Sequence, residues 1–357
     1  MSTESLPPDY YERREQPRGR RNWKRIAAFI AGGLLVLTAV FLVGIVALLH
    51  NEAFRQYLLR IAYTKLNDTV GVQLKMRDFS VHLSGVSPAV DMYDVVIDSA
   101  PPYQATPLLK VDHLSVGIQV VSLLQRKWYL KDIVIDHPVA RVFAGENGET
   151  NLPTLKSSDQ ETSVFDLGVR HVMLGQGEVY YNDQKSALDA DLHNLEFQAT
   201  FDPSPKRYSG GLSYKDGRIH LQNLNPIIHN FEAEFEATPD FFTLKRSVLA
   251  SGASQFSLTA RLDDYVHPKV TASYQSSLDT AELRQVIKDP MLVGVVKLAG
   301  SAKFESDPNK PVLQTLSLEG NLTSNGVQVH TSTVHTLVRD ISVRYLLDKG
   351  DAEVRDL

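Results

Sequence analysis

Apolar and polar residues alternate along most of the chain after Gly71, and this pattern predicts β-strands. The clearest runs are Phe231–Ala237, Phe256–Asp263 and Val270–Gln275, where every second side chain is apolar. Such strands bury one face and leave the other in water, which is typical of antiparallel sheets. Turn-forming residues separate the runs, among them Asp202-Pro203, Asp216-Gly217, Asp307-Pro308 and Asn325-Gly326. We therefore expect a mostly β fold.

The alternation slips by one residue in a single run. Leu188, Ala190 and Leu192 occupy even positions, whereas Leu195 and Phe197 continue the apolar series at odd positions. An extra residue in one strand of a pair forms a β-bulge, which shifts the pattern in this way. The sequence therefore predicts a bulge between Leu192 and Leu195.

Three segments have helical patterns. The run Ile26–Leu49 has no charged residue in 24 positions, which is long enough to cross a bilayer core of about 30 Å. Residues 50–70 carry apolar side chains at helical spacing and predict an amphipathic helix that caps the sheet or lies on a membrane surface. The third candidate, Asp279–Asp289, is short, and Asp279 or Thr280 could cap its start.

The charges around the apolar run predict its orientation. Seven Arg and Lys residues lie between positions 13 and 25, and the segment after Leu49 opens with Glu52. A cleaved signal peptide would have a shorter apolar region and a small-residue cleavage site, which HNEAFRQ does not offer. By the positive-inside rule, we expect residues 1–25 to form a basic, disordered cytoplasmic tail and 26–49 an uncleaved signal anchor. Residues 71–357 would then lie across the membrane, in the periplasm of a bacterium.

Composition removes several classes of function. The 357-residue chain has 37 basic and 42 acidic residues, so it lacks the excess positive charge of a nucleic-acid binder. It has no cysteine, which excludes disulfides, thiolate metal sites and cysteine nucleophiles. For the same reason cysteine usage says nothing about the compartment.

The many half-apolar strands raise a packing problem, because each apolar face needs a second layer. Predicted helices are too few to cover a sheet of this size. A sandwich, a closed barrel or a curved sheet with an occupied inner face would each solve the problem. In the last case an acyl chain suits the inner face, since each buried methylene contributes about 0.8 kcal/mol. Periodicity alone leaves the three open.

A loose internal repeat suggests that strand pairs are added along the fold. Residues 177–199 and 325–350 each contain a Gly, a strand, a gap, an apolar residue before an acid, and a second strand. A turn and a short segment follow each copy, at 216–224 and 349–357. We expect the sequence to be a fragment, or short for its kind, because it stops within the second copy.

Catalytic and metal-binding motifs are absent from the sequence. It contains no G-x-S-x-G, no H-E-x-x-H among 11 histidines, no phosphate loop and no EF-hand pattern at 145–148. Asp132 and Asp136 would share one face of a strand, but at that spacing they lie roughly 13 Å apart, too far for paired-carboxylate catalysis. We therefore interpret Asp132, Asp136 and His137 as a solvated strand end, with Pro138 at the break before a second strand. We expect no enzyme activity, no cofactor and no metal.

The order of elements in the region 108–155 resembles the N-terminal region of the AsmA-like family, which includes TamB. This region reads LLKVDHLSVGIQVVSLLQRKWYLKDIVIDHPVARVFAGENGETNLPTL. The N-terminal anchor, the strand TVGVQLKMRDFSV, the MYDVVI strand before Pro101-Pro102 and the later GEVYYNDQ…LHNLEF segment fit the same family. The resemblance covers most of residues 26–357, and its motifs are patterned rather than chemical.

The resemblance implies an N-terminal transmembrane helix followed by an elongated, curled antiparallel β-sheet with an open hydrophobic groove and a short capping helix. It also implies anchoring in the bacterial inner membrane and transfer of phospholipid toward the outer membrane. Alternatively, a TamB-type assembly factor would help outer-membrane β-barrel proteins by strand pairing with an outer-membrane partner. For the first function we predict groove-facing, lipid-binding side chains at Leu192, Phe197, Phe231, Phe235, Phe256 and Leu258.

Overall fold

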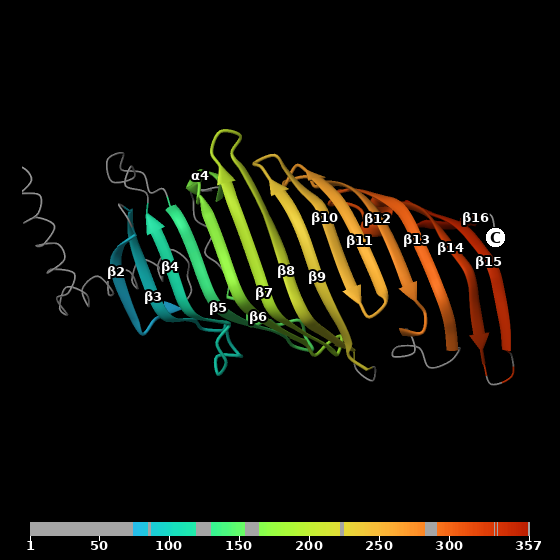
Figure 1. The fold of residues 1–357 in the computed structure, drawn as a ribbon, viewed down its shortest axis with the longest axis horizontal. Helices are drawn as coiled ribbons and strands as arrows, with labels where there is room; N and C mark the ends of the chain where they lie inside the picture. The colour runs from blue at the N-terminus through green and yellow to red at the C-terminus, as the bar shows by residue number, and fades with distance from the viewer. Residues whose placement is uncertain are drawn as a thin grey trace, which may run out of the picture. The chain divides into compact units, whose positions relative to one another are not determined.

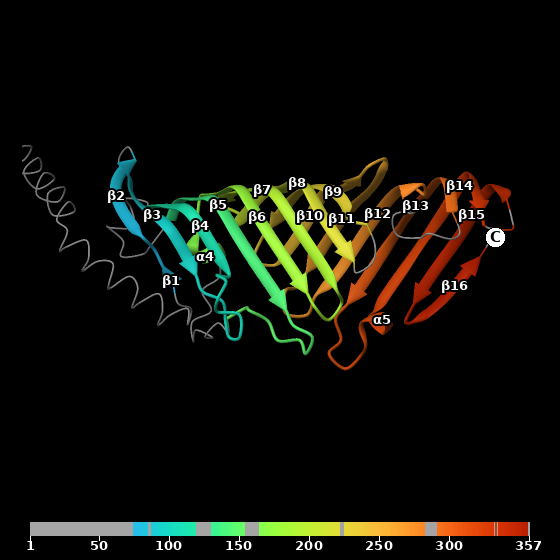
Figure 2. The same ribbon diagram turned by 90° about the horizontal axis from the view of Figure 1, so that it is seen from below.

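The computed structural model describes residues 74–84, 87–118, 130–153, 164–221, 225–282, 291–331, 333 and 335–355. These residues form one open sheet with two four-residue helices (Figures 1 and 2). The predicted tail, signal anchor and amphipathic helix, at 1–25, 26–49 and 50–70, lie outside the described residues. Within the part that is described, no helix is long and apolar enough to span a membrane.

The strands are β1 (Leu74–Lys75), β2 (Asp78–Ser84), β3 (Ser87–Ile97), β4 (Leu109–Ile118), β5 (Leu130–Ala144), β6 (His171–Asp183), β7 (Leu188–Asp202), β8 (Arg207–Leu221), β9 (Ile227–Ala237), β10 (Phe241–Ser251), β11 (Ser254–Asp263), β12 (Lys269–Asp279), β13 (Met291–Glu305), β14 (Leu316–His330), β15 (His335–Asp348) and β16 (Asp351–Arg355). The helices are α4 (Val164–Leu167) and α5 (Val312–Thr315).

The strands follow one another across the sheet in chain order from β3 to β16, and β1 and β2 both pair with β3. This order confirms the mostly β prediction and selects an open, curved sheet over the sandwich and the barrel. One detail of the prediction was wrong, because β5 and β6 are parallel whereas all other pairs are antiparallel. Residues 145–170 separate the two strands in the sequence, and β6 runs in the same direction as β5.

The region around Pro138 is one strand rather than the predicted two. β5 continues from Leu130 to Ala144, and Pro138 is buried in its interior, paired with Val111. The strand survives because His137 takes a positive φ of 49°, which bends the backbone just before the proline. Asp136 therefore lies in the middle of a strand and not at a solvated end.

A row of residues in the left-handed backbone region crosses the N-terminal half of the sheet. Asp94, His137, Gln176, Asn194 and Asp216 all have φ between 49° and 56°. The pairing registers align them in one cross-strand row, in which β4 separates Asp94 from His137, and the ladder is interrupted along β6, β7 and β8. Asn, Asp and His tolerate this conformation best among non-glycine residues, and it is typical of bulges. The bulge predicted between Leu192 and Leu195 is one member of this row.

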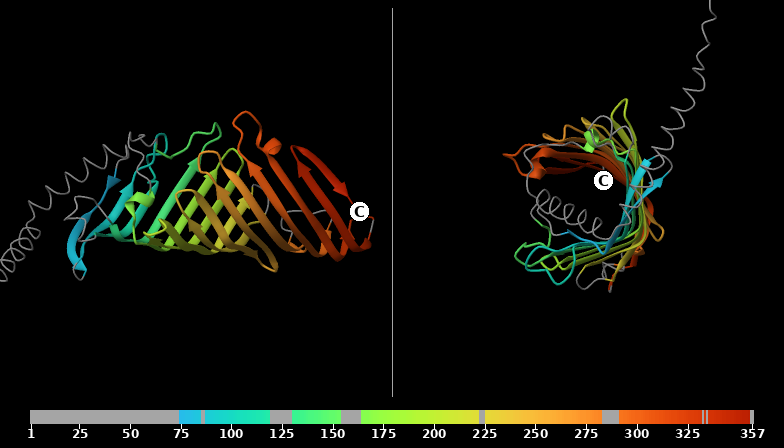
Figure 3. Two further views of the ribbon diagram at one scale, coloured as in Figure 1. Left: turned by 90° about the horizontal axis from the view of Figure 1, so that it is seen from above. Right: turned by 90° about the vertical axis from the view of Figure 1, so that its left-hand side faces the viewer.

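The alternation gives the sheet two faces that we name by their chemistry. The apolar face carries, for example, Phe235, Leu244 and Ala260 in three neighbouring strands, and the polar face carries Glu236, Thr243 and Arg261 beside them. The sheet is curled, as the end-on view in Figure 3 shows.

Side chains on the apolar face meet across intervening strands, which indicates the direction of the curl. Phe197 of β7 stacks on Phe235 of β9 with ring centroids 5.6 Å apart, although β8 lies between them. Strands lie about 4.8 Å apart, so these two rings converge. On the polar face the ion pairs join neighbouring strands, as between Lys245 and Glu236. Because side chains converge on the concave side of a curved sheet, we assign the apolar face to the concave side.

The predicted helix at Asp279–Asp289 is described only at its start. Asp279 is the last residue of β12, and its carboxylate accepts a hydrogen bond from the Ala281 amide two residues later. The Thr280 hydroxyl donates to the Gly294 carbonyl and does not cap a helix. Residues 283–290 lie outside the described part.

Candidate functional site

All six side chains predicted to contact lipid lie on the apolar face. Phe231, Leu249 and Phe256 form one cross-strand row, and Leu258 lies two residues farther along β11. Phe197 and Phe235 stack on one another, as described above, and Phe235 also stacks on Phe242 at 5.9 Å. Leu192 pairs with Val179 beyond the bulge. The structure brings the six together on one surface, and their contact with lipid stays a prediction.

This surface is only partly shielded from solvent. Most of its side chains are half-buried, and Phe256 is 37% exposed. Among the described residues, no second sheet lies against it, and the two helices have four residues each. A partly exposed apolar face of this kind is a candidate surface for an apolar partner.

Two tyrosines form a polar bridge on the apolar face near the C-terminal edge. The hydroxyls of Tyr274 in β12 and Tyr345 in β15 are 2.6 Å apart, although two strands lie between them. Gly300 and Gly320 occupy the two positions under the bridge, in the same cross-strand row. Glycine inside a strand often marks a close approach, so these two glycines were a usable signal that the sequence reasoning missed.

A buried histidine is the second polar group on this face. His229 in β9 is 4% exposed, and its Nδ1 lies within hydrogen-bond distance of the Tyr214 hydroxyl, at 2.9 Å. Burial lowers the pKa of His229, which favours the neutral form. The buried Nε2 has no hydrogen-bond partner among the described residues. The predicted strand began at Phe231 and did not include His229.

The polar face holds a crosswise network that starts from two Asp-His dipeptides. Asp112 pairs in register with His137, and His113 pairs with Asp136, and both ring Nδ1 atoms lie 2.7 Å from the opposite carboxylate. His113 also places Nε2 3.3 Å from Asp91. The hydrogen bonds to Asp136 and Asp112 raise the pKa values of His113 and His137, respectively.

The network ties the first strands of the sheet together. Asp91 is 7% exposed, and its carboxylate also lies 2.8 Å from His82 Nδ1. The contacts therefore run from β2 to β5. Within the described residues, no group of three or more His, Asp or Glu is placed to hold a metal ion. The repeated Asp-His dipeptide was the signal for this cluster, and the sequence reasoning weighed only one of its copies.

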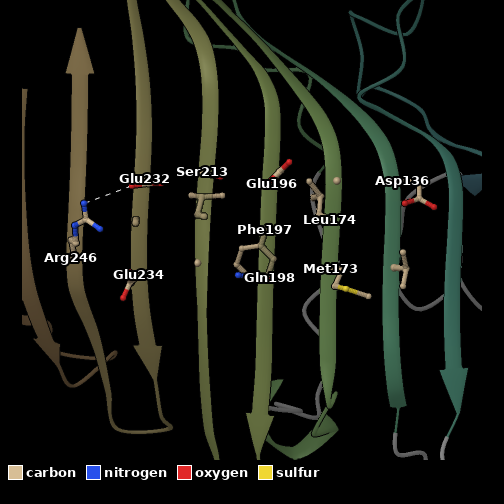
Figure 4. A pocket seen from close by; sticks show the side chains of 15 residues that line it. Asp136, Met173, Leu174, Glu196, Phe197, Gln198, Ser213, Glu232, Glu234 and Arg246 are labelled. Atoms are coloured by element: carbon tan, nitrogen blue, oxygen red, sulfur yellow. Dashed lines mark ion pairs between the residues drawn. The ribbon is translucent and has the colours of Figure 1, made fainter. Parts of the chain in front are cut away.

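A hollow of about 500 Å³ lies on the polar face across β5 to β10 (Figure 4). Carboxylates line it at Asp136, Glu196, Glu232 and Glu234, and Arg246 pairs with Glu232 at 3.9 Å. Its charged walls do not suit an acyl chain. The candidate site for an apolar ligand is therefore the apolar face, and this hollow is a solvated feature of the opposite side.

Comparison with known proteins identifies the family. The model of the AsmA family matches residues 21–353, which is nearly the whole of this 357-residue chain. The chain therefore belongs to the AsmA family. No curated protein matches it.

Proposed function

We propose that this member of the AsmA family binds the acyl chains of phospholipids on the apolar face of its curled sheet. The observation that carries the proposal is the continuity of that face across an open sheet, from β3 to β15. Ten buried methylene groups would contribute roughly 8 kcal/mol, enough to draw a lipid tail from water. Family membership supports the same function.

The remaining parts of the proposal concern location and direction. The apolar run Ile26–Leu49 would anchor the chain in the inner membrane of a bacterium, with the sheet in the periplasm. A sheet that offers the same surface strand after strand can pass a lipid along its length toward the outer membrane. The polar face would remain in water, since its exposed carboxylates and bases need hydration.

One substitution pair on adjacent residues tests the proposal. Leu258 points to the apolar face and Thr259 to the polar face of the same strand. In the full chain purified in mild detergent, Leu258→Arg should reduce the co-purified phospholipid several-fold, because it places a charge among acyl chains. Thr259→Arg should leave the phospholipid content unchanged. Equal lipid content in both folded variants and the parent would contradict lipid binding on this face.

A second candidate function rests on the free edge of β15. β16 pairs only with Arg344–Asp348, so no described strand pairs with the outer edge of His335–Val343. An unpaired edge can accept a strand from another protein. We propose strand pairing with outer-membrane β-barrel precursors as the alternative, in line with an assembly factor.

Disulfide trapping tests this alternative. The Leu337→Cys variant is mixed with unfolded barrel precursors that each carry one cysteine at a different position of a strand. Crosslinks that follow a regular register along the precursor strand would support strand pairing. Crosslinks with no register preference, or none above those from Thr259→Cys, would contradict it.

A further inference from the structure

The tyrosine bridge lies in one continuous cross-strand row on the apolar face. The row runs from Leu258 through Tyr274, Gly300 and Gly320 to Tyr345. A Cβ atom at Gly300 would come within 2.6 Å of Tyr274 Cζ, and one at Gly320 within 2.7 Å of Tyr345 Cζ. Both rings therefore lie flat over the glycines, a position that any larger residue would block.

The two hydroxyls have one more proton than they have good acceptors for. They share one short hydrogen bond of 2.6 Å, which uses a single proton. Among the described residues, the only other acceptor near the two hydroxyls is the Glu319 carbonyl, 3.4 Å from Tyr274 Oη. That distance is beyond the usual 2.5–3.0 Å of a hydroxyl bond. When Tyr274 donates to Tyr345, the Tyr345 proton has no acceptor among the described residues.

Tyr274 keeps its phenolic proton at any physiological pH. Burial, followed by the hydrogen bond with Tyr345, raises the pKa of Tyr274 well above its usual value. The bridge is therefore a neutral hydrogen-bond donor. It is reachable, because both tyrosines are only half-buried.

The surroundings of the bridge are apolar and uncharged. On one side the parallel row holds Ala272, Ala302, Leu318 and Leu347, and on the other it holds Ser276, Leu298, Leu322 and Val343. The lysines and arginines of these strands lie on the polar face, as at Lys303 and Arg344. A charged phosphate would thus lose its hydration here without gaining a cation, whereas a neutral carbonyl would lose little.

We propose that the Tyr274–Tyr345 bridge is a binding station for the ester carbonyl of a glycerolipid. The free phenolic proton donates to the carbonyl, while the acyl chains extend over the apolar rows on either side. The bridge thereby gives the lipid a fixed register on a surface that is otherwise uniform. This inference rests on the proposed function, because it specifies which part of the lipid is held and where.

Diester and diether phosphatidylcholines with the same chains and headgroup test the proposal, since only the diester has the carbonyls. The full chain in mild detergent should bind the diester about 5–10-fold more tightly, the value of one hydrogen bond of roughly 1–1.4 kcal/mol. The double variant Tyr274→Phe/Tyr345→Phe should bind both lipids equally, at the affinity of the diether. Tyr181→Phe, which removes a hydroxyl elsewhere on the apolar face, should keep the preference.

A second variant separates the hydroxyls from their placement. Gly300→Ala leaves both hydroxyls in the chain, but its Cβ would meet the Glu319 carbonyl as well as the Tyr274 ring. It shifts the β13–β14 backbone together with the ring, and the folded variant should also lose the preference for the diester. Hydrogen exchange in β12–β15 verifies that each variant is folded. Tyr345→Phe alone does not serve as the test, because it frees the Tyr274 proton to donate to the carbonyl. Equal binding of the two lipids by the parent chain, or an unchanged preference in the folded double variant, would overturn the station only. Failure of the parent to bind either lipid would overturn the proposed function itself.

Discussion

The two ends of the sheet have the same alternating pattern but different burial. In β2–β8, which we call the N-terminal region, apolar side chains are buried at Phe79, Ala89, Val95, Val111, Val139, Ala199 and Phe201. In β10–β15, the C-terminal region, only Val327 reaches that state among the described apolar residues. The alternation of apolar and polar residues therefore does not determine how deeply the apolar side chains are buried.

The connections explain the difference between the two regions. In the N-terminal region, Tyr103 stacks on Phe143, and Phe165 of α4 contacts Tyr208. Asn151, which is fully buried, joins the loops after β3 and β5. In the C-terminal region the connections between β10 and β11 and between β11 and β12 are short turns. The N-terminal region is thus packed locally, and the C-terminal region leaves its apolar face available to a ligand.

Truncating one phenylalanine in each region should give the largest contrast. Phe201 is 7% exposed and Phe256 is 37% exposed. Phe201→Ala should lower the free energy of local unfolding by about 3–5 kcal/mol through lost burial and a cavity. Phe256→Ala should cost less than about 1 kcal/mol, because its side chain is exposed in the absence of ligand. Hydrogen exchange in β7–β8 and β11–β12 measures both effects. Equal losses in the two regions would remove the proposed distinction.

Asn151→Ala should be the next largest change. The side chain donates to the Ser99 hydroxyl at 3.0 Å and to the Arg141 carbonyl at 2.7 Å, and it accepts from the Phe143 amide at 2.9 Å. Its loss leaves buried groups without partners, which should cost about 2–4 kcal/mol in the N-terminal region. Hydrogen exchange should show the loss in β4–β5 and not in β12–β14. Asn321→Ala, at an exposed position of β14, is the matched control and should change little.

Substitution in the left-handed row should have a moderate effect. Asn194 has φ of 50°, a conformation that β-branched residues resist. Asn194→Val should lower the free energy of unfolding by about 1–2 kcal/mol. Gln198→Val, on an exposed position of the same strand, should be neutral or slightly stabilising. Denaturant unfolding followed by circular dichroism compares the two variants. An unchanged free energy of unfolding in Asn194→Val would argue against the left-handed conformation at this position.

The smallest effect should be a pH dependence confined to the N-terminal region. Hydrogen bonds raise the pKa values of His113 and His137 in the folded protein. The two histidines therefore contribute fully to stability below the pKa of an unfolded histidine, about 6.5. This contribution is lost as the pH rises through their folded values. The hydrogen bond from His137 lowers the pKa of Asp112, whose contribution is present above about 3.9 and lost as the pH falls through its folded value.

Stability of the N-terminal region should therefore be greatest between about pH 4 and 6.5 and should decline toward pH 8. The charged groups facing these histidines are Asp91, Asp94, Asp112, Asp136, Glu178, His82 and Lys110. Each exposed pair contributes no more than about 1 kcal/mol. Protection factors of β3–β5 should fall between pH 6 and pH 8, and His137→Gln should reduce that change. An equal decline in β12–β14 would contradict the assignment to this network.

The alternation of apolar and polar residues predicted the features that are set within a single strand. The strands at 231–237, 256–263 and 270–275 and the slip after Leu192 all follow from side chains pointing alternately to two faces. The inward positions of the six candidate residues follow from the same rule. Their shared surface was predictable because antiparallel neighbours keep their faces aligned.

Features that depend on pairing between distant strands were not predictable in this way. The parallel β5–β6 pair depends on the path of a 26-residue connection, and the crosswise Asp-His contacts depend on the register of β4 against β5. The tyrosine bridge depends on four strands at once. Pro138 misled the prediction because its neighbour His137 adopts a positive φ, which the sequence does not specify.

Photo-crosslinking from paired positions tests the central claim most directly. Phe235 and Glu234 are adjacent in β9, and Leu258 and Thr259 are adjacent in β11, with one member of each pair on each face. A photoreactive residue at each position of the full chain, in membranes that contain labelled phospholipid, reports which face meets acyl chains. The account predicts phospholipid adducts at positions 235 and 258 and few at 234 and 259. Adducts to protein alone at 235 and 258, or equal lipid labelling on the two faces, would contradict it.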